Sequence, residues 1–67
     1  MIITGEYIKL DSFLKAVNEA DSGGTAKLLI ADGLVLVNGE PELRRGRKLR
    51  AGDLVSVNGR SYSVEVE

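Results

Sequence analysis

The chain has 67 residues, with nine lysines and arginines, ten aspartates and glutamates, and neither cysteine nor histidine. A chain of about 60 residues buries only about 60% of its unfolded surface, so we expect one small domain spanning residues 1–67. The lack of cysteine and histidine excludes disulfides, thiolate nucleophiles, the commonest general base and the commonest metal ligands. No apolar stretch reaches the roughly 18–20 residues of a membrane span. The first residues lack a basic start followed by a long apolar core, so we expect no secretory signal and a cytoplasmic location.

The first predicted elements are a short strand near Tyr7–Ile8 and a helix over residues 12–19. Residues 4–6 interrupt the strand-forming start of the chain. Asp11 is the expected N-cap, because its carboxylate can accept hydrogen bonds from free first-turn amides. One apolar stripe, at i, i+3, i+4 and i+7, identifies the buried face of the helix. The stripe consists of Leu10, Phe13, Leu14 and Val17.

A second helix is predicted from about Gly24–Thr25, after a connector that contains two glycines. Its apolar positions again follow helical spacing. Gly33 stands where a helix needs a residue in the left-handed conformation, so the helix should end there. The apolar positions are Ala26, Leu29 and Ile30.

The remainder of the chain has the pattern of β-strands joined by tight turns. Residues 34–37 and 54–57 are rich in valine and leucine, and an Asn-Gly pair that favours a hairpin turn follows each run. These pairs are Asn38–Gly39 and Asn58–Gly59.

Residues 51–53 form a further expected turn, and a last strand follows the second hairpin turn. The expected fold class is α+β, with two short helices packed on a small, mainly antiparallel sheet in the order β-α-α-β-β-β-β. One face of the last strand would carry Tyr62, Val64 and Val66.

The composition and spacing of the polar residues do not favour an enzyme. The carboxylates are scattered without the spacing of a calcium loop, and Ser22 and Lys27 belong to no known nucleophile motif. So short a chain is also poorly suited to forming a substrate cleft. We therefore expect no catalytic residues, metal, cofactor or small-molecule substrate.

The glycine-containing turn at residues 22–25 has two interpretations. Glycines at a helix start leave backbone amides free beside the positive end of the helix dipole, which suits a phosphate. Alternatively, Ser22 or Thr25 caps the helix and the glycines permit a tight connection, which is the simpler interpretation.

Residues 44–50 carry five positive charges, most of them on arginine, within a chain whose net charge is −1. Such a run can be an ordinary solvated loop. However, arginine binds phosphate through a planar fork, and a basic strip on an acidic molecule directs one face toward a polyanion. The strip contains Arg44, Arg45, Arg47, Lys48 and Arg50.

The aromatic residues are too few for a platform on which several bases stack. Phe13 belongs to the helix stripe and Tyr62 to the expected core, which leaves Tyr7. Recognition of a structured RNA through its phosphates and shape therefore fits the sequence better.

Several of these residues, in this order and at these spacings, resemble the S4-like RNA-binding domain family, named after ribosomal protein S4. The resemblance covers residues 10–57. Within the family, the sequence looks most like the stand-alone, single-domain bacterial members labelled S4-domain protein YaaA, which are linked to ribosomes. It rests on Leu10, Asp11, Phe13 and Leu14; Ser22, Ala26, Lys27, Ile30 and Gly33; Val35, Val37, Asn38 and Gly39; and Leu49, Gly52 and Asp53.

The resemblance implies that the two helices and the following hairpin form one RNA-facing surface. In many members the residue after the motif serine is an arginine that contacts RNA, whereas here it is Gly23. That departure leaves the amides of Gly23 and Gly24, together with Lys27, as contacts on this side and increases the importance of the basic run. The candidate RNA-binding residues are Ser22, Gly23, Gly24, Thr25, Lys27, Arg44, Arg45, Arg47, Lys48 and Arg50.

We therefore expect a monomeric, non-catalytic protein that binds ribosomal RNA or a ribosomal subunit in assembly or quality control. The alternative is a protein-interaction module whose basic strip docks on an acidic partner protein, which the net negative charge favours. Binding to a membrane surface is less favoured, because the basic residues do not lie on an amphipathic helix.

Overall fold

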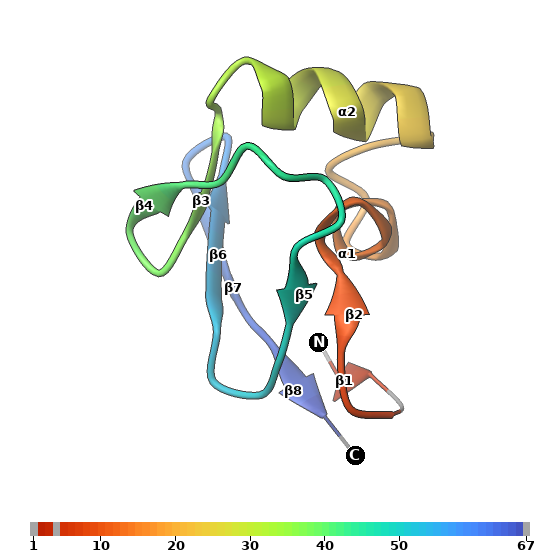
Figure 1. The fold of residues 1–67 in the computed structure, drawn as a ribbon, viewed down its shortest axis with the longest axis vertical. Coiled ribbons are helices and arrows are strands. Elements are labelled where there is room, and N and C mark those ends of the chain that lie inside the picture. The colour runs from red at the N-terminus through yellow and green to blue at the C-terminus, as the bar shows by residue number, and fades with distance from the viewer. Residues whose placement is uncertain (1, 4, 67) are drawn as a thin grey trace.

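The computed structural model describes residues 2–3 and 5–66, and in this part of the chain no helix is long and apolar enough to span a membrane. The helices are α1 (Leu10–Ala16) and α2 (Gly23–Ala31), and α2 lies across one end of the molecule next to α1 (Figure 1). The strands are β1 (Ile2–Ile3), β2 (Ile8–Lys9), β3 (Val35–Val37), β4 (Glu40–Pro41), β5 (Lys48–Leu49), β6 (Leu54–Val57), β7 (Arg60–Ser63) and β8 (Glu65–Val66).

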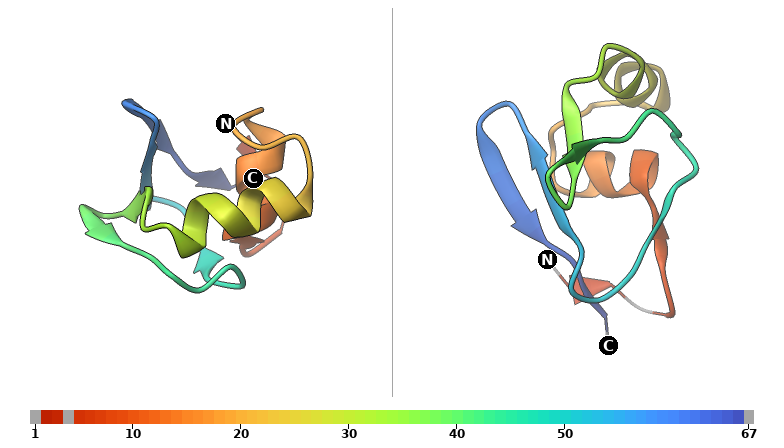
Figure 2. Two further views of the ribbon diagram at one scale, coloured as in Figure 1. Left: turned by 90° about the horizontal axis from the view of Figure 1, so that it is seen from above. Right: turned by 60° about the vertical axis from the view of Figure 1, so that its left-hand side comes forward.

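The strands form one larger sheet and two short pairs. The larger sheet is antiparallel, in the order β4-β3-β6-β7. Strands β2 and β5 form an antiparallel ribbon, and β1 pairs with β8 in parallel. Helix α1 lies between the β6–β7 hairpin and β2 (Figure 2, right). The expected α+β class, with two helices on mainly antiparallel strands, is confirmed.

The core lies between the helices and the inner faces of the strands. The stripe predicted for α1 is confirmed, since three of its members are fully buried and Val17 packs against them. The Phe13 ring meets the Tyr62 ring edge-on, with centroids 6.3 Å apart, a favoured aromatic geometry. The buried residues are Leu10, Phe13, Leu14, Ala20, Ala26, Ile30, Val35, Val37, Leu49, Val55, Val57 and Val64.

Helix α1 begins earlier than predicted, and the expectation that Asp11 caps it is wrong. Asp11 lies inside the first turn, where its carboxylate accepts a hydrogen bond from the Ser12 amide at 2.8 Å. The backbone of the basic run takes the place of a side-chain cap. The amide of Leu10 donates to the carbonyl of Arg47 at 2.8 Å, and that of Asp11 donates to the carbonyl of Arg45 at 3.1 Å.

The end of α1 also differs from the prediction, since the helix stops at Ala16 and does not reach Glu19. Asn18 adopts a left-handed conformation with φ of 63°. Asparagine tolerates this conformation better than most residues, and it turns the chain back so that the amide of Glu19 donates to the carbonyl of Leu14 at 2.9 Å.

Glu19 joins the end of α1 to the β6–β7 hairpin. Its side chain is only 3% exposed and accepts hydrogen bonds from Arg60 Nη1 at 3.1 Å, Asn58 Nδ2 at 3.2 Å and the Tyr62 hydroxyl. The bond from Tyr62 is the largest cause of a lowered pKa at Glu19. Glu19 lies off the apolar stripe of α1, so the sequence pattern did not reveal this buried carboxylate.

Helix α2 agrees with the prediction, although it begins at Gly23. Ser22 is the N-cap and its hydroxyl accepts a hydrogen bond from the Thr25 amide at 3.2 Å, while the Thr25 hydroxyl donates to Asp21 at 2.6 Å. Gly33 has a φ of 73°, as expected for the residue that ends this helix.

Both hairpin turns are confirmed. Asn38 and Asn58 have φ of 53°, and the glycine after each is also left-handed, as a type I′ turn requires. The last strand, however, is divided into β7 and β8, because the chain leaves the larger sheet after Ser63 to pair with β1. Val64 is buried at this break, whereas the side chain of Val66 lies outside the described part.

Strand β5 was not predicted, because it occupies only Lys48–Leu49 of the basic run and its partner lies far away in sequence. That partner is β2, which lies one residue beyond the strand expected at Tyr7–Ile8. Gly5 and Glu6 form the expected bend before it, and Thr4 lies outside the described residues.

Candidate nucleic-acid interface

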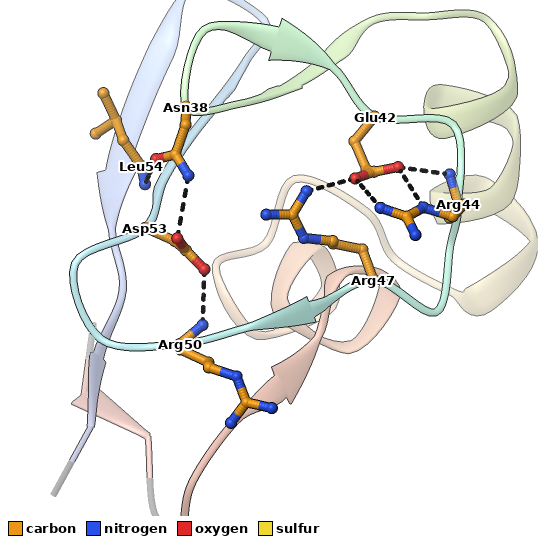
Figure 3. Close-up of polar contacts among 7 residues, drawn as sticks. All are labelled: Asn38, Glu42, Arg44, Arg47, Arg50, Asp53 and Leu54. Atoms are coloured by element: carbon orange, nitrogen blue, oxygen red, sulfur yellow. Dashed lines mark hydrogen bonds and ion pairs between the residues drawn. The ribbon is translucent and has the colours of Figure 1, made fainter.

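The basic segment, residues 44–50, follows β4 in the chain, passes the start of α1 and includes β5 of the ribbon (Figure 1). Its backbone is fixed to the first turn of α1 by the two amide–carbonyl bonds described above and continues into β5. Its end is fixed as well, since the Arg50 amide donates to Asp53 at 2.8 Å in the expected turn over residues 51–53 (Figure 3). The charges are therefore carried by an ordered segment.

Glu42 organises two of the arginines. Its carboxylate accepts from Arg47 Nη1 at 2.6 Å, and from Nε and Nη2 of Arg44 at 3.0 and 3.2 Å (Figure 3). The Glu42 side chain is 10% exposed, whereas those of Arg44 and Arg47 are 74% and 31% exposed. The bonds from Arg44, then those from Arg47, lower the pKa of Glu42 to about 2. One carboxylate thus holds two guanidiniums and leaves the group of three with a net positive charge.

Arg45 brings the basic segment to the start of α2. Its Nε lies 3.4 Å from the Asp11 carboxylate. A side-chain carbon added at Gly23 would lie 3.6 Å from Nη2 of Arg45, so the guanidinium lies directly beside this glycine. The turn at residues 22–25 and the basic segment, which are separated in sequence, therefore meet on one surface.

The start of α2 offers backbone donors on that surface. The Thr25 amide is satisfied by Ser22, which supports the capping interpretation for this serine. Among the described residues, no hydrogen-bond acceptor is found for the amides of Gly23 and Gly24. Capping and anion binding are therefore compatible at this turn, because they use different amides. Lys27 is exposed on α2 and belongs to no ion pair in the described part of the chain.

Lys48 and Arg50 lie at the other end of the segment, next to an aromatic ring. Lys48 Nζ is 4.9 Å and Arg50 Cζ is 5.7 Å from the centroid of Tyr7. The ten predicted residues thus form three groups and one separate residue. Arg45 lies at the start of α2 with residues 22–25, Glu42 holds Arg44 and Arg47, and Lys48 and Arg50 lie beside Tyr7. Lys27 stands apart from these groups. Sequence reasoning did not identify Glu42 as the residue that organises the arginines, although it is the acidic residue nearest to them in sequence.

Comparisons with known proteins find a matching family model and similar proteins in two bacteria. A family model described as the S4 domain matches residues 1–65. The chain is 49% identical over 57 residues to the "Probable ribosome maturation protein RlbA" of Bacillus subtilis (strain 168), covering 85% of this chain and 80% of that protein. It is 40% identical over 58 residues to the "Putative RNA-binding protein YbcJ" of Escherichia coli (strain K12), covering 87% and 83%.

A solved structure is similar as well. The crystal structure of 30S ribosomal protein S4e from Thermoplasma acidophilum matches with a TM-score of 0.63 and 25% sequence identity. The match covers 87% of this chain but only 30% of that one, so the shared part is one module of a longer protein.

Proposed function

The chain belongs to the S4 domain family, and we propose that it is a non-catalytic RNA-binding protein that acts in ribosome maturation. The names of the two similar proteins, one a probable ribosome maturation protein and one a putative RNA-binding protein, support this role. Structured ribosomal RNA is the proposed partner. The proposal includes action as a monomer in the cytoplasm, where ribosomes are assembled.

The observation that carries the proposal is the position of Arg45 beside Gly23. It places a guanidinium next to two backbone amides at the positive end of α2, an arrangement suited to an RNA phosphate. Where many family members present an arginine after the motif serine, this chain has a glycine, and Arg45 of the basic segment brings a guanidinium beside that glycine.

The remaining cations extend the surface. The ion pairs with Glu42 orient Arg44 and Arg47 before RNA arrives, which reduces the conformational entropy lost on binding. Lys48, Arg50 and Lys27 add positive charge at its edges. If four or five phosphates are neutralised, the logarithm of the binding constant falls with the logarithm of the salt concentration at a slope of roughly −3 to −4.

The test is filter binding of the purified protein to purified ribosomal RNA at increasing KCl concentrations. Arg45→Gln should weaken binding and make the slope shallower by about 0.7 to 0.9, because one phosphate contact is lost. Arg60→Gln is the matched control, since Arg60 is 68% exposed on the β6–β7 hairpin, which lies on the other side of α1 from β2 (Figure 2, right). Binding that is insensitive to salt, or unchanged by Arg45→Gln, would contradict the proposal.

Capture from cell lysate with and without RNase separates this function from docking on an acidic protein. Partners that disappear after RNase treatment support RNA binding. One acidic protein that is retained after RNase treatment would support the docking module.

A further inference from the structure

The ribbon of β2 and β5 has one face toward the core and one toward solvent. Leu49 is fully buried and Ile8, its register partner, packs against the same core. Because side chains alternate along a strand, the neighbouring residues project from the opposite face. We call this outer surface the ribbon face, and it consists of Tyr7, Lys9, Lys48 and Arg50.

Three cations on the ribbon face are not neutralised within the described chain. Lys9 stands directly opposite Lys48 in the strand register, and facing like charges destabilise an antiparallel pair. Among the described residues, Lys9, Lys48 and Arg50 form no ion pair. Such a concentration of charge on an otherwise acidic molecule is suited to an anionic partner.

Tyr7 provides an aromatic ring among these cations. Its side chain is exposed, with a relative exposure of 39%, whereas Phe13 is fully buried and Tyr62 donates its hydroxyl hydrogen bond to Glu19. Lys48 and Arg50 lie within cation–π distance of the Tyr7 ring. Contacts of this kind at exposed sites are weaker than the stacking of a nucleobase on an aromatic side chain. A base can therefore replace the cations at the ring while the cations move to its phosphates.

We propose that the ribbon face binds one unpaired nucleotide of RNA, with the base stacked on Tyr7 and the flanking phosphates held by Lys9, Lys48 and Arg50. The inference rests on the proposed RNA-binding function and adds the kind of RNA feature that is recognised. One ring accommodates one base, so it differs from the platform for several bases that the aromatic content argued against.

The ribbon face is continuous with the rest of the candidate surface, which supports RNA as its partner. The ribbon extends, through the hydrogen bonds of Leu10 and Asp11, to the backbone of Arg47 and Arg45. One RNA molecule can therefore contact the α2 start and the ribbon face along the same backbone segment. An unpaired nucleotide next to a helical stem provides both the phosphates of a structured RNA and an accessible base.

The test uses two RNA hairpins with the same stem, one fully paired and one with a single bulged 2-aminopurine, whose fluorescence reports stacking. The parent should bind the bulged hairpin more tightly and change its fluorescence. Tyr7→Leu should lose about fivefold or more of its affinity for the bulged hairpin, and Tyr7→Phe should retain it. Lys9→Gln should make the salt slope shallower by about 0.7 to 0.9, and the control Arg60→Gln should leave it unchanged.

The outcomes separate this inference from the proposed function. If Tyr7→Leu binds the bulged hairpin as tightly as the parent, or loses affinity equally for both hairpins, base stacking on Tyr7 is refuted. A second outcome is that Arg45→Gln weakens the binding of both hairpins while the Tyr7 and Lys9 variants weaken the binding of neither. In that case the ribbon face is excluded as an RNA-binding surface, and the proposed RNA-binding function stands. If the parent binds neither hairpin nor ribosomal RNA, the proposed function itself fails. Circular dichroism of each variant verifies its fold.

Discussion

Replacement of Glu42 by glutamine tests whether this carboxylate stabilises the protein through Arg44 and Arg47. Glutamine keeps the size and one acceptor oxygen but removes the charge. The two guanidiniums would then be held by weaker, neutral acceptors. We expect Glu42→Gln to fold and to be less stable than the parent at neutral pH.

The pKa of Glu42 sets the size of the effect. It falls from 4.5 to about 2 in the folded protein, which at about 1.36 kcal/mol for each pKa unit gives an upper limit of about 3 kcal/mol. Arg44 is 74% exposed, so solvent screening reduces the contribution to about 1–2 kcal/mol. For a domain of this size, each kcal/mol corresponds to a change in melting temperature of roughly 4–8 °C.

The pH dependence gives the sharper test. A carboxylate whose pKa is lowered by folding stabilises the protein fully above its unfolded pKa of 4.5, and the effect is lost as the pH falls toward about 2. The difference in melting temperature between parent and Glu42→Gln should therefore be constant from pH 7 to pH 5. At pH 3 about half of it should remain.

Thermal unfolding followed by circular dichroism at pH 7, 5 and 3 measures this difference. Glu40→Gln is the control, because Glu40 is exposed and has no ion pair in the part of the chain that the structure describes. Equal melting temperatures of parent and Glu42→Gln at pH 7 would refute the reasoning. So would a difference that is as large at pH 3 as at pH 7.

Two further substitutions test contacts made by residues outside the basic segment. Glu19→Gln should lower the melting temperature at pH 7, because the carboxylate that accepts from Arg60, Asn58 and Tyr62 loses its charge; an unchanged melting temperature would contradict this role. Ser22→Ala should lower the free energy of unfolding by about 1 kcal/mol, because it removes the N-cap of α2. Urea unfolding measures this loss. The control Ser63→Ala, at an exposed serine, should have little effect on the free energy of unfolding. Equal losses in the two serine variants would argue against the cap.

The elements that could be predicted from sequence are those whose determinants are local. The Ser22 cap and Gly33 delimit α2, and an Asn-Gly pair specifies each hairpin through its own backbone preferences. The family motifs combine these same signals, so they identified the fold correctly. Elements that depend on a distant partner were missed or misplaced: β5 exists through pairing with β2, and α1 begins early because the basic segment satisfies its first amides.

The candidate site shows the same division. The positive charge of the basic segment is evident from sequence, but the positions of its side chains in space are not. Glu42 is one acidic residue among ten, and only the folded chain places it between Arg44 and Arg47. Likewise, the approach of Arg45 to Gly23 depends on the packing of two segments that are far apart in the chain.

The pairing of Leu10 and Asp11 with the carbonyls of Arg47 and Arg45 has a consequence for cooperativity. Detachment of the basic segment would free these two amides at the start of α1, so their native-state hydrogen exchange follows the opening of the segment. Slow exchange of these two amides therefore reports that the basic surface is assembled. RNA bound to that surface would slow their exchange further, although they lie on the helix and need not contact the RNA.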